Sequence, residues 1–160
     1  MDIRDARPEE FGRIGELRVA AYRADGFLNE GYAGTLRVLA TDGTGEILAA
    51  VDDGRILGTV TLVTWPHGGE VLRGPGEGEI RALAVAAPAR GRGIGRALIA
   101  AVMQRAIARE VRDLLLLTQP EMRAAQHLYT EAGFRRLPDR DYEFASGFLL
   151  IAFGLSLAGQ

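Results

Sequence analysis

The sequence predicts an α/β protein, and three observations lead to this prediction. Four consecutive leucines at residues 114–117 lie between charged residues and Pro120, which is typical of a central parallel strand buried on both faces. Amphipathic patterns with helical spacing lie on both sides of this run in the chain. The pair Asp53-Gly54 joins two β-rich runs and supplies the positive φ angles of a tight hairpin turn.

The first half of the chain begins with a short strand and a helix. Pro8 suits the first helical turn because it lacks an N–H, and Glu9 and Glu10 face the positive end of the helix. Apolar residues then recur at helical spacing. We expect strands at residues 3–6, 47–51 and 55–64, and helices at residues 8–24 and 33–40.

The second half alternates strands and helices after a long loop. Residues 66–78 are polar and rich in glycine and proline, and a loop of this length in a compact domain is often functional. Gly133 suits the left-handed position after a helix end. We expect strands at residues 79–85, 114–117, 134–137 and 148–155, and helices at residues 94–110 and 122–132. The chain then holds about seven strands and about four helices in one domain, residues 1–160.

The composition excludes several classes of protein. Of the 160 residues, 48% are hydrophobic and 25% charged, as in a folded globular protein. The absence of cysteine excludes a disulfide scaffold and a thiol nucleophile, and no metal site is visible. All 19 basic residues are arginine, which excludes a Walker lysine, and the net charge of −2 argues against nucleic acid as a partner.

Two segments bear on localisation. Residues 1–4 are charged and lack the apolar core of a secretory signal. The longest apolar stretch, residues 148–157, is interrupted by Gly154 and Ser156 and is shorter than the ~20 residues of a membrane helix. We therefore predict a cytoplasmic protein with no membrane partner.

A glycine-rich segment, residues 90–96, predicts an anion-binding turn. It follows the strand at residues 79–85 and opens a helix, so bare backbone N–H groups and the positive helix end coincide. A diphosphate fits such a turn. The dinucleotide fingerprint fails, because its third glycine would fall on Arg96 or Leu98. The segment consists of Arg90, Gly91, Arg92, Gly93, Ile94, Gly95 and Arg96, whose three arginines place cations around the anion.

These residues resemble the GNAT superfamily of N-acetyltransferases. Its acyl-CoA signature matches Arg90-x-x-Gly93-x-Gly95 after an apolar strand end, and a second signature follows downstream, made of Ala125, Leu128, Tyr129, Gly133 and Phe134. The resemblance implies a mixed, mostly antiparallel central sheet. It also implies transfer of an acetyl group from acetyl-CoA to a primary amine of a small molecule or peptide, by direct attack in a ternary complex.

The resemblance also implies how acetyl-CoA is held. The backbone of Leu83, Ala84 and Val85 would pair with the pantetheine arm, and a main-chain N–H near Leu83 would polarise the thioester carbonyl. The N–H groups between Gly91 and Arg96 would hold the pyrophosphate. A polar Asn common in the family is Met122 here, and Arg123 or Gln126 takes over its contact.

Two side chains are implied as catalytic. Glu79 matches a glutamate that deprotonates the amine, usually through a water, and Tyr129 matches a tyrosine that protonates the leaving thiolate. Alternatives stay open: Glu77 could replace Glu79 as the base, Glu79 could simply pair with Arg81, and Tyr129 could be an ordinary half-buried helix tyrosine. A β-bulge, common in the family, would change which side chains of this strand share a face.

The sequence leaves the acceptor amine open. We expect it between three segments that hold aromatic and acidic residues: 27–32, 65–78 and 139–143. A non-catalytic acyl-CoA-binding regulatory module is the alternative to an enzyme. The apolar last strand and the sheet edge beside it predict a homodimer.

Overall fold

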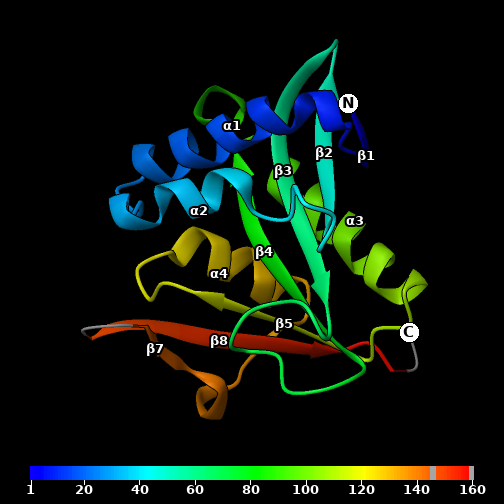
Figure 1. The fold of residues 1–160 in the computed structure, drawn as a ribbon, viewed down its shortest axis with the longest axis vertical. Helices are drawn as coiled ribbons and strands as arrows, with labels where there is room; N and C mark the ends of the chain where they lie inside the picture. Colours follow the sequence, from blue (N-terminus) through cyan, green and yellow to red (C-terminus); the bar gives the residue numbers. More distant parts are fainter. Residues whose placement is uncertain (145–146, 159–160) are drawn as a thin grey trace. The chain divides into compact units, whose positions relative to one another are not determined.

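The computed structural model describes residues 1–144 and 147–158 and has an α/β architecture (Figure 1). The described residues form an eight-stranded sheet in the order β1-β2-β3-β4-β5-β8-β6, with β7 paired to β8. The chain divides into two compact units, residues 1–61 with 82–102 and residues 62–81 with 103–160. Strands β3 and β4 and helix α3 contribute residues to both units, and each unit is described separately below.

The first unit packs two helices beside the start of the sheet. Helix α1 runs next to α2 (Figure 1), and Gly15 permits this approach, because a Cβ there would lie 2.4 Å from the Arg37 carbonyl oxygen. The buried Arg18 guanidinium ties α1 to its neighbours by donating to the carbonyls of Leu36 and Leu39 and to the Thr61 hydroxyl. The elements are β1 (Asp2–Asp5), η1 (Pro8–Glu10), α1 (Phe11–Ala24), η2 (Glu30–Tyr32), α2 (Ala33–Val38), β2 (Glu46–Asp52), β3 (Arg55–Thr64), η3 (Ala87–Ala89) and the start of α3 (Ile94–Ala108).

The second unit is built around β5, in which Leu114, Leu115 and Leu116 are buried and Leu117 is half-buried. It pairs in parallel with β4 and antiparallel with β8. Gly154 of β8 faces Leu137 and Leu115, and a Cβ there would lie 2.5 Å from Leu137 Cδ1. The elements are the start of β4 (Glu77–Val85), β5 (Asp113–Thr118), α4 (Arg123–Glu131), β6 (Arg135–Arg136), η4 (Pro138–Arg140), β7 (Tyr142–Phe144) and β8 (Phe148–Ser156).

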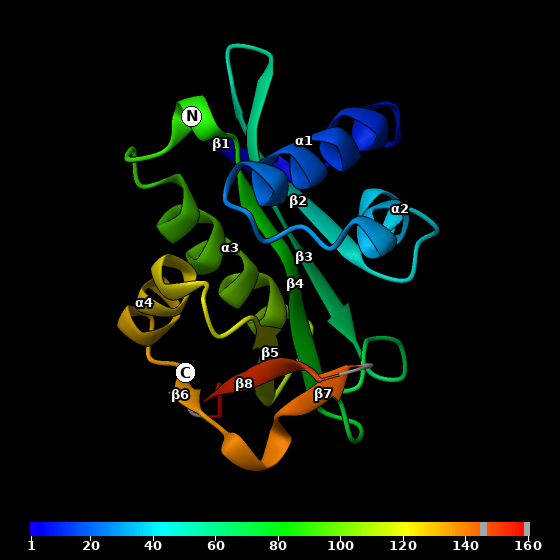
Figure 2. The ribbon, with the colours of Figure 1, turned by 90° about the vertical axis from the view of Figure 1, so that its left-hand side faces the viewer.

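The structure confirms the predicted α/β class and most predicted elements. The turn between β2 and β3, at the top of Figure 2, has φ of +51° at Asp53 and +77° at Gly54, as a two-residue hairpin turn requires. The predicted helix at 8–24 begins with one turn of 3₁₀ helix at Pro8–Glu10. Strand β7 was not predicted, because three residues are too few to show a periodic pattern. The single-domain organisation stays a prediction.

Candidate active site

The anion-binding turn lies in the first unit, between η3 and α3. Gly91 and Gly93 have φ of +80° and +77°, which glycine adopts without strain, and a Cβ at either would meet no other atom within 4 Å. The N–H of Ala97 donates to the Gly93 carbonyl at 3.0 Å at the start of α3. The N–H groups that precede it lie in the first turn, where α-helix geometry provides no acceptor within the helix.

The helix start is fixed by close packing on β3. Ile94 and Leu98 are buried. A Cβ on Gly58 would lie 3.1 Å from Ile94 Cγ2 and 3.0 Å from Leu98 Cδ1. The same Cβ would lie 3.0 Å from the Ala84 carbonyl oxygen. A glycine at position 58 therefore allows α3 and the end of β4 to approach β3 directly, which sets the position of the glycine-rich turn.

Two arginines of the turn are held by carboxylates. Arg90 forms an ion pair with Asp25 and also donates to the Val85 carbonyl at 3.2 Å. Arg92 reaches Asp52, with 3.4 Å between Nη2 and Oδ2. These side chains connect the turn to Asp25 after α1 and to β2, and the prediction that Arg90, Arg92 and Arg96 place cations around an anion stays a prediction. Binding of an anion by the backbone N–H groups likewise stays a prediction.

The end of β4 carries an irregular backbone at Ala82. Its φ of +54° is left-handed, the conformation found in one class of β-bulge. Ala82 packs against the cluster of Val19, Ala33 and Leu36. Beyond it, Ala84 is buried, while Leu83 and Val85 are half-buried. The left-handed residue lies between this strand end and Glu79 in the chain, and the anticipated bulge stays a prediction.

Glu79 lies in the second unit and is 3% exposed. Its Oε1 accepts a hydrogen bond from the Gly69 N–H at 2.7 Å, and its Oε2 lies 3.9 Å from Arg81 Nε. Burial raises the pKa of this carboxyl, and the opposing influences of Arg81 and of the Gly69 N–H are smaller. A carboxylate in this state is a stronger proton acceptor than a solvated one.

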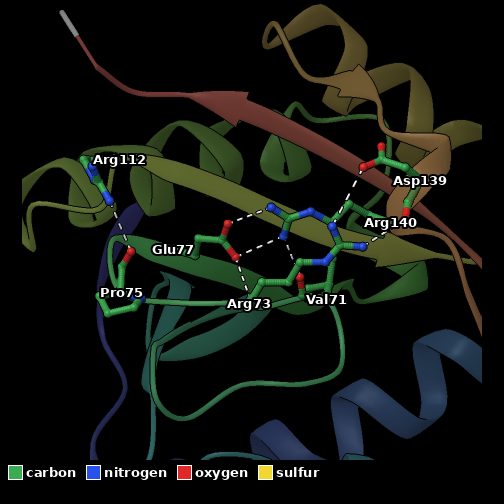
Figure 3. A network of polar contacts seen from close by, with 7 residues as sticks. All are labelled: Val71, Arg73, Pro75, Glu77, Arg112, Asp139 and Arg140. Atoms are coloured by element: carbon green, nitrogen blue, oxygen red, sulfur yellow. Dashed lines mark hydrogen bonds and ion pairs between the residues drawn. The ribbon is translucent and has the colours of Figure 1, made fainter.

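The carboxylate of Glu77, the alternative base, is bound by the Arg140 guanidinium (Figure 3). Arg140 donates to both of its carboxylate oxygens, at 3.0 and 2.7 Å, and the Arg73 N–H donates to Oε1 at 2.8 Å. The hydrogen bonds from Arg140 are the main reason that the pKa of Glu77 is lowered. This arrangement favours a structural role for Glu77 and leaves Glu79 as the candidate base.

Tyr129 lies on α4 in the second unit and is 6% exposed. Its ring centroid is 5.8 Å from that of Phe134 and 6.5 Å from that of Phe153. Gly133 ends the helix with φ of +105°, which allows the Phe134 N–H to donate to the Tyr129 carbonyl at 3.0 Å. The ring is therefore firmly placed, and the role of the hydroxyl as an acid stays a prediction.

The residues near the start of α4 that were predicted to contact acetyl-CoA differ in their contacts and exposure. Gln126 Nε2 donates to the carbonyls of Gln119 and Pro120, at 3.0 and 3.1 Å, and so fixes the loop between β5 and α4. Arg123 is exposed. Met122 Sδ lies 3.4 Å from the Thr118 hydroxyl, which donates to it. Any contact of Arg123 or Gln126 with acetyl-CoA stays a prediction.

Two of the three segments expected around the acceptor meet within the second unit. Arg140 donates to the Val71 carbonyl at 2.8 Å, and Arg73 donates to the Asp139 carbonyl at 3.0 Å (Figure 3). Asp141 pairs with Arg136, so the acidic groups of residues 139–143 are largely matched by arginines. Residues 27–32 belong to the first unit and are considered apart from them.

The sequence analysis missed the contacts that hold the loop. Arg140 and Gly69 gave no signal beyond a charge cluster and a glycine-rich stretch, because their partners are far away in sequence. Within residues 1–144 and 147–158, no group of acidic and histidine side chains is arranged to hold a metal ion. In that same part of the chain, no helix is both long and apolar enough to cross a membrane.

Comparison with known proteins gives consistent matches. Residues 6–134 match the family model described as the acetyltransferase (GNAT) family. The chain is 41% identical over 92 residues to mycothiol acetyltransferase from Cellulomonas flavigena, which covers 56% of this chain and 26% of that protein. The chain thus spans about a quarter of the length of this relative.

Solved structures share the fold. A ribosomal-protein-alanine N-acetyltransferase from Brucella melitensis aligns with TM-score 0.73 and 20% identity over 98% of this chain and 100% of that chain. A GNAT family acetyltransferase from the same organism, in complex with acetyl-CoA, aligns with TM-score 0.70 and 21% identity over 98% and 87% of the two chains.

Proposed function

The chain belongs to the acetyltransferase (GNAT) family, and we propose that it transfers an acetyl group from acetyl-CoA to a primary amine by direct attack in a ternary complex. The buried Glu79 is the observation that most favours this function. A non-catalytic acyl-CoA-binding module has no need of a buried carboxylate with a raised pKa, whereas amine acylation needs a proton acceptor.

The proposed reaction uses two side chains and the backbone. Glu79 accepts a proton from the ammonium group, directly or through a water, and the free amine attacks the thioester carbonyl carbon. The new C–N bond forms as the C–S bond breaks, the Tyr129 hydroxyl supplies a proton to the leaving thiolate, and the resulting phenolate recovers a proton from the nitrogen of the new amide, directly or through water. The N–H groups of residues 91–96 bind the pyrophosphate, and the strand end at Leu83 binds the pantetheine arm.

The first acceptor to test follows from one relative. The name of the Cellulomonas protein points to mycothiol, so the desacetyl form of mycothiol heads the panel. Small polyamines, amino sugars and peptide N-termini complete it. A cytoplasmic location and a homodimer are further proposals, and light scattering checks the second of these.

The test combines binding and turnover. Unfolding temperature is measured with acetyl-CoA and with NAD as the control, and only acetyl-CoA is expected to raise it, by roughly 5 °C at a large excess over its dissociation constant. Turnover is then followed with a thiol reagent, which reports released CoA without background because the chain has no cysteine. Acceptors that contain a thiol are followed by mass spectrometry.

The outcomes separate the two candidate functions. Acetylated product from any amine supports the enzyme. Binding of acetyl-CoA with no product across the panel supports the regulatory module instead. If the protein neither binds acetyl-CoA nor acetylates any amine of the panel, the proposed function is contradicted altogether.

A further inference from the structure

The loop at residues 65–76 lies over the candidate base, and Arg140 is one of the residues that hold this loop, together with Arg73 and Arg112. We propose that Arg140 is a positioning residue for Glu79: by clasping Glu77 and the Val71 carbonyl, it keeps this loop closed over the carboxylate. The proposal rests on the proposed role of Glu79 as the base. It adds a residue that sequence motifs do not identify.

The clasp is a set of contacts centred on one guanidinium (Figure 3). Arg140 donates to both Glu77 oxygens and to the Val71 carbonyl, so it joins η4, β4 and the loop. The Arg73 N–H donates to the same Glu77 carboxylate, and the Arg73 guanidinium donates to the Asp139 carbonyl. Arg140 and Glu77 are both largely shielded from water, with side chains 17% and 13% exposed, which strengthens the pair relative to a surface one.

The loop connects this clasp to Glu79 over a few residues. Val71 and Leu72 are buried among Leu115 and Ala152, and the Leu72 N–H donates to the Gly69 carbonyl at 3.3 Å. The N–H of Gly69 in turn donates to Glu79. The Val71 carbonyl that Arg140 holds is therefore two residues from the donor that orients the base.

The same loop also shields Glu79 from water. A Cβ on Gly69 would lie 3.3 Å from Glu79 Oε1, so the loop backbone rests directly on the carboxylate. The charged groups that act on this carboxylate are Arg81 from β4 and Glu70 from the loop itself. Opening the loop would admit water, and hydration favours the ionised form of the carboxyl.

The test compares two arginines with matched contacts. Arg140→Gln removes a two-oxygen carboxylate contact and one bond to a carbonyl. Arg136→Gln is the control, because Arg136 makes the same kind of contacts, to Asp141 and to the Ala152 carbonyl, and donates no hydrogen bond to the loop at residues 65–76 among those described. The measurement is the pH profile of kcat/KM for an amine substrate, whose acid limb reports the base of the free enzyme.

The expected results are specific. In Arg140→Gln the acid limb moves to lower pH and kcat/KM on the plateau falls roughly tenfold, because the base is weaker and less well oriented. In Arg136→Gln the limb stays in place. Arg140→Lys keeps the charge but not the paired geometry, so its limb falls between those of the parent and Arg140→Gln.

A second measurement keeps the inference separate from the proposed reaction. A carbon-13 NMR titration of the Glu79 carboxyl needs no substrate, and it should show a lower pKa in Arg140→Gln than in the parent. If Arg140→Gln does not fold, Glu77→Gln, which removes the ion pair but keeps an acceptor, takes its place. An unchanged Glu79 titration in a folded variant would overturn the inference, whether or not an amine is acetylated.

Discussion

Glu10 in the first unit and Glu79 in the second are buried to nearly the same degree, at 4% and 3% exposure, yet their carboxyl groups differ in acidity. Arg4 donates to both oxygens of Glu10 at 2.9 Å, and the Arg7 N–H donates to one of them at 2.8 Å. These bonds lower the pKa of Glu10 to about 2. At Glu79, burial instead raises the pKa.

The difference lies in the partners and in how strongly burial acts on each carboxyl, because burial is the main influence on the pKa of Glu79 and a lesser one at Glu10. The ionised form of Glu10 is satisfied from three directions, so water is not needed to stabilise it. Among the described residues, Glu79 accepts one hydrogen bond, from a backbone N–H, and its nearest cation is 3.9 Å away. Burial alone therefore does not identify a catalytic carboxylate. The small number of donors is what makes Glu79, and not Glu10, the candidate base.

The largest expected effect is a loss of kcat/KM in the Glu79 variant that the Glu10 variant does not show. Glu79→Gln should lower kcat/KM about 10²-fold, because the variant loses the proton acceptor while keeping the shape of the side chain. Steady-state kinetics at saturating acetyl-CoA measure this, and the affinity for acetyl-CoA should stay unchanged. Glu10→Gln serves as the control. Equal losses in both variants, with both proteins folded, would show that the comparison carries no catalytic information.

The next effect concerns stability. Glu10→Gln should reduce the free energy of unfolding at pH 7 by about 2 kcal/mol, because one member of a charge-assisted pair is lost. The folded pKa of about 2 lies below the ordinary value of 4.5, so this stabilisation is present above about pH 4.5 and is lost as the pH falls toward 2. Urea unfolding across this range checks both statements. A constant difference between the proteins down to pH 2 would be inconsistent with the ion pair.

Glu79 should show the opposite pH dependence. Its folded pKa is raised, so above about pH 4.5 the folded protein retains a proton that the unfolded chain has already released. The free energy of unfolding therefore falls as the pH rises through that interval, and Glu79→Gln removes this fall. Urea unfolding should find the variant at least as stable as the parent at pH 7, with the gap closing in acid. A variant that is less stable at pH 7 would mean that Glu79 stabilises the fold.

The smallest effect probes the one cation near the base. Arg81→Gln should move the acid limb of kcat/KM to slightly higher pH, because the positive charge on Arg81 favours the ionised carboxylate. The direction is opposite to that expected for Arg140→Gln, so the two variants together test the sign of each influence. A shift to lower pH would show that Arg81 acts on Glu79 through the loop instead of through its charge.

Local patterns in the sequence were sufficient to predict most of the strands and helices. The run at residues 114–117 became β5, and β3 has the predicted bounds, because period and turn residues are local signals. Pro8–Glu10 forms 3₁₀ helix where α-helix was predicted, since the two differ only in the hydrogen-bond register of one turn.

The contacts of the candidate site were harder to predict from the sequence than the fold. The motif that contains Tyr129 and the strand that contains Glu79 could be identified, and the family resemblance favoured Glu79, but the local sequence gives no physical reason to prefer Glu79 over Glu77. What distinguishes them is Arg140, which binds Glu77 from 63 residues away. A contact over that distance depends on the tertiary fold, and no short-range pattern encodes it.

The loop over Glu79 contains positions where the side chain can be changed and positions where the backbone and packing do not allow a change. A side chain at Gly68 would need a left-handed backbone, and its Cβ would lie 2.5 Å from Leu72 Cδ1. Trp65, His67 and Glu70, by contrast, are exposed. A library that randomises these three positions and leaves Gly68, Gly69 and residues 71–78 untouched should change acceptor preference while retaining the base.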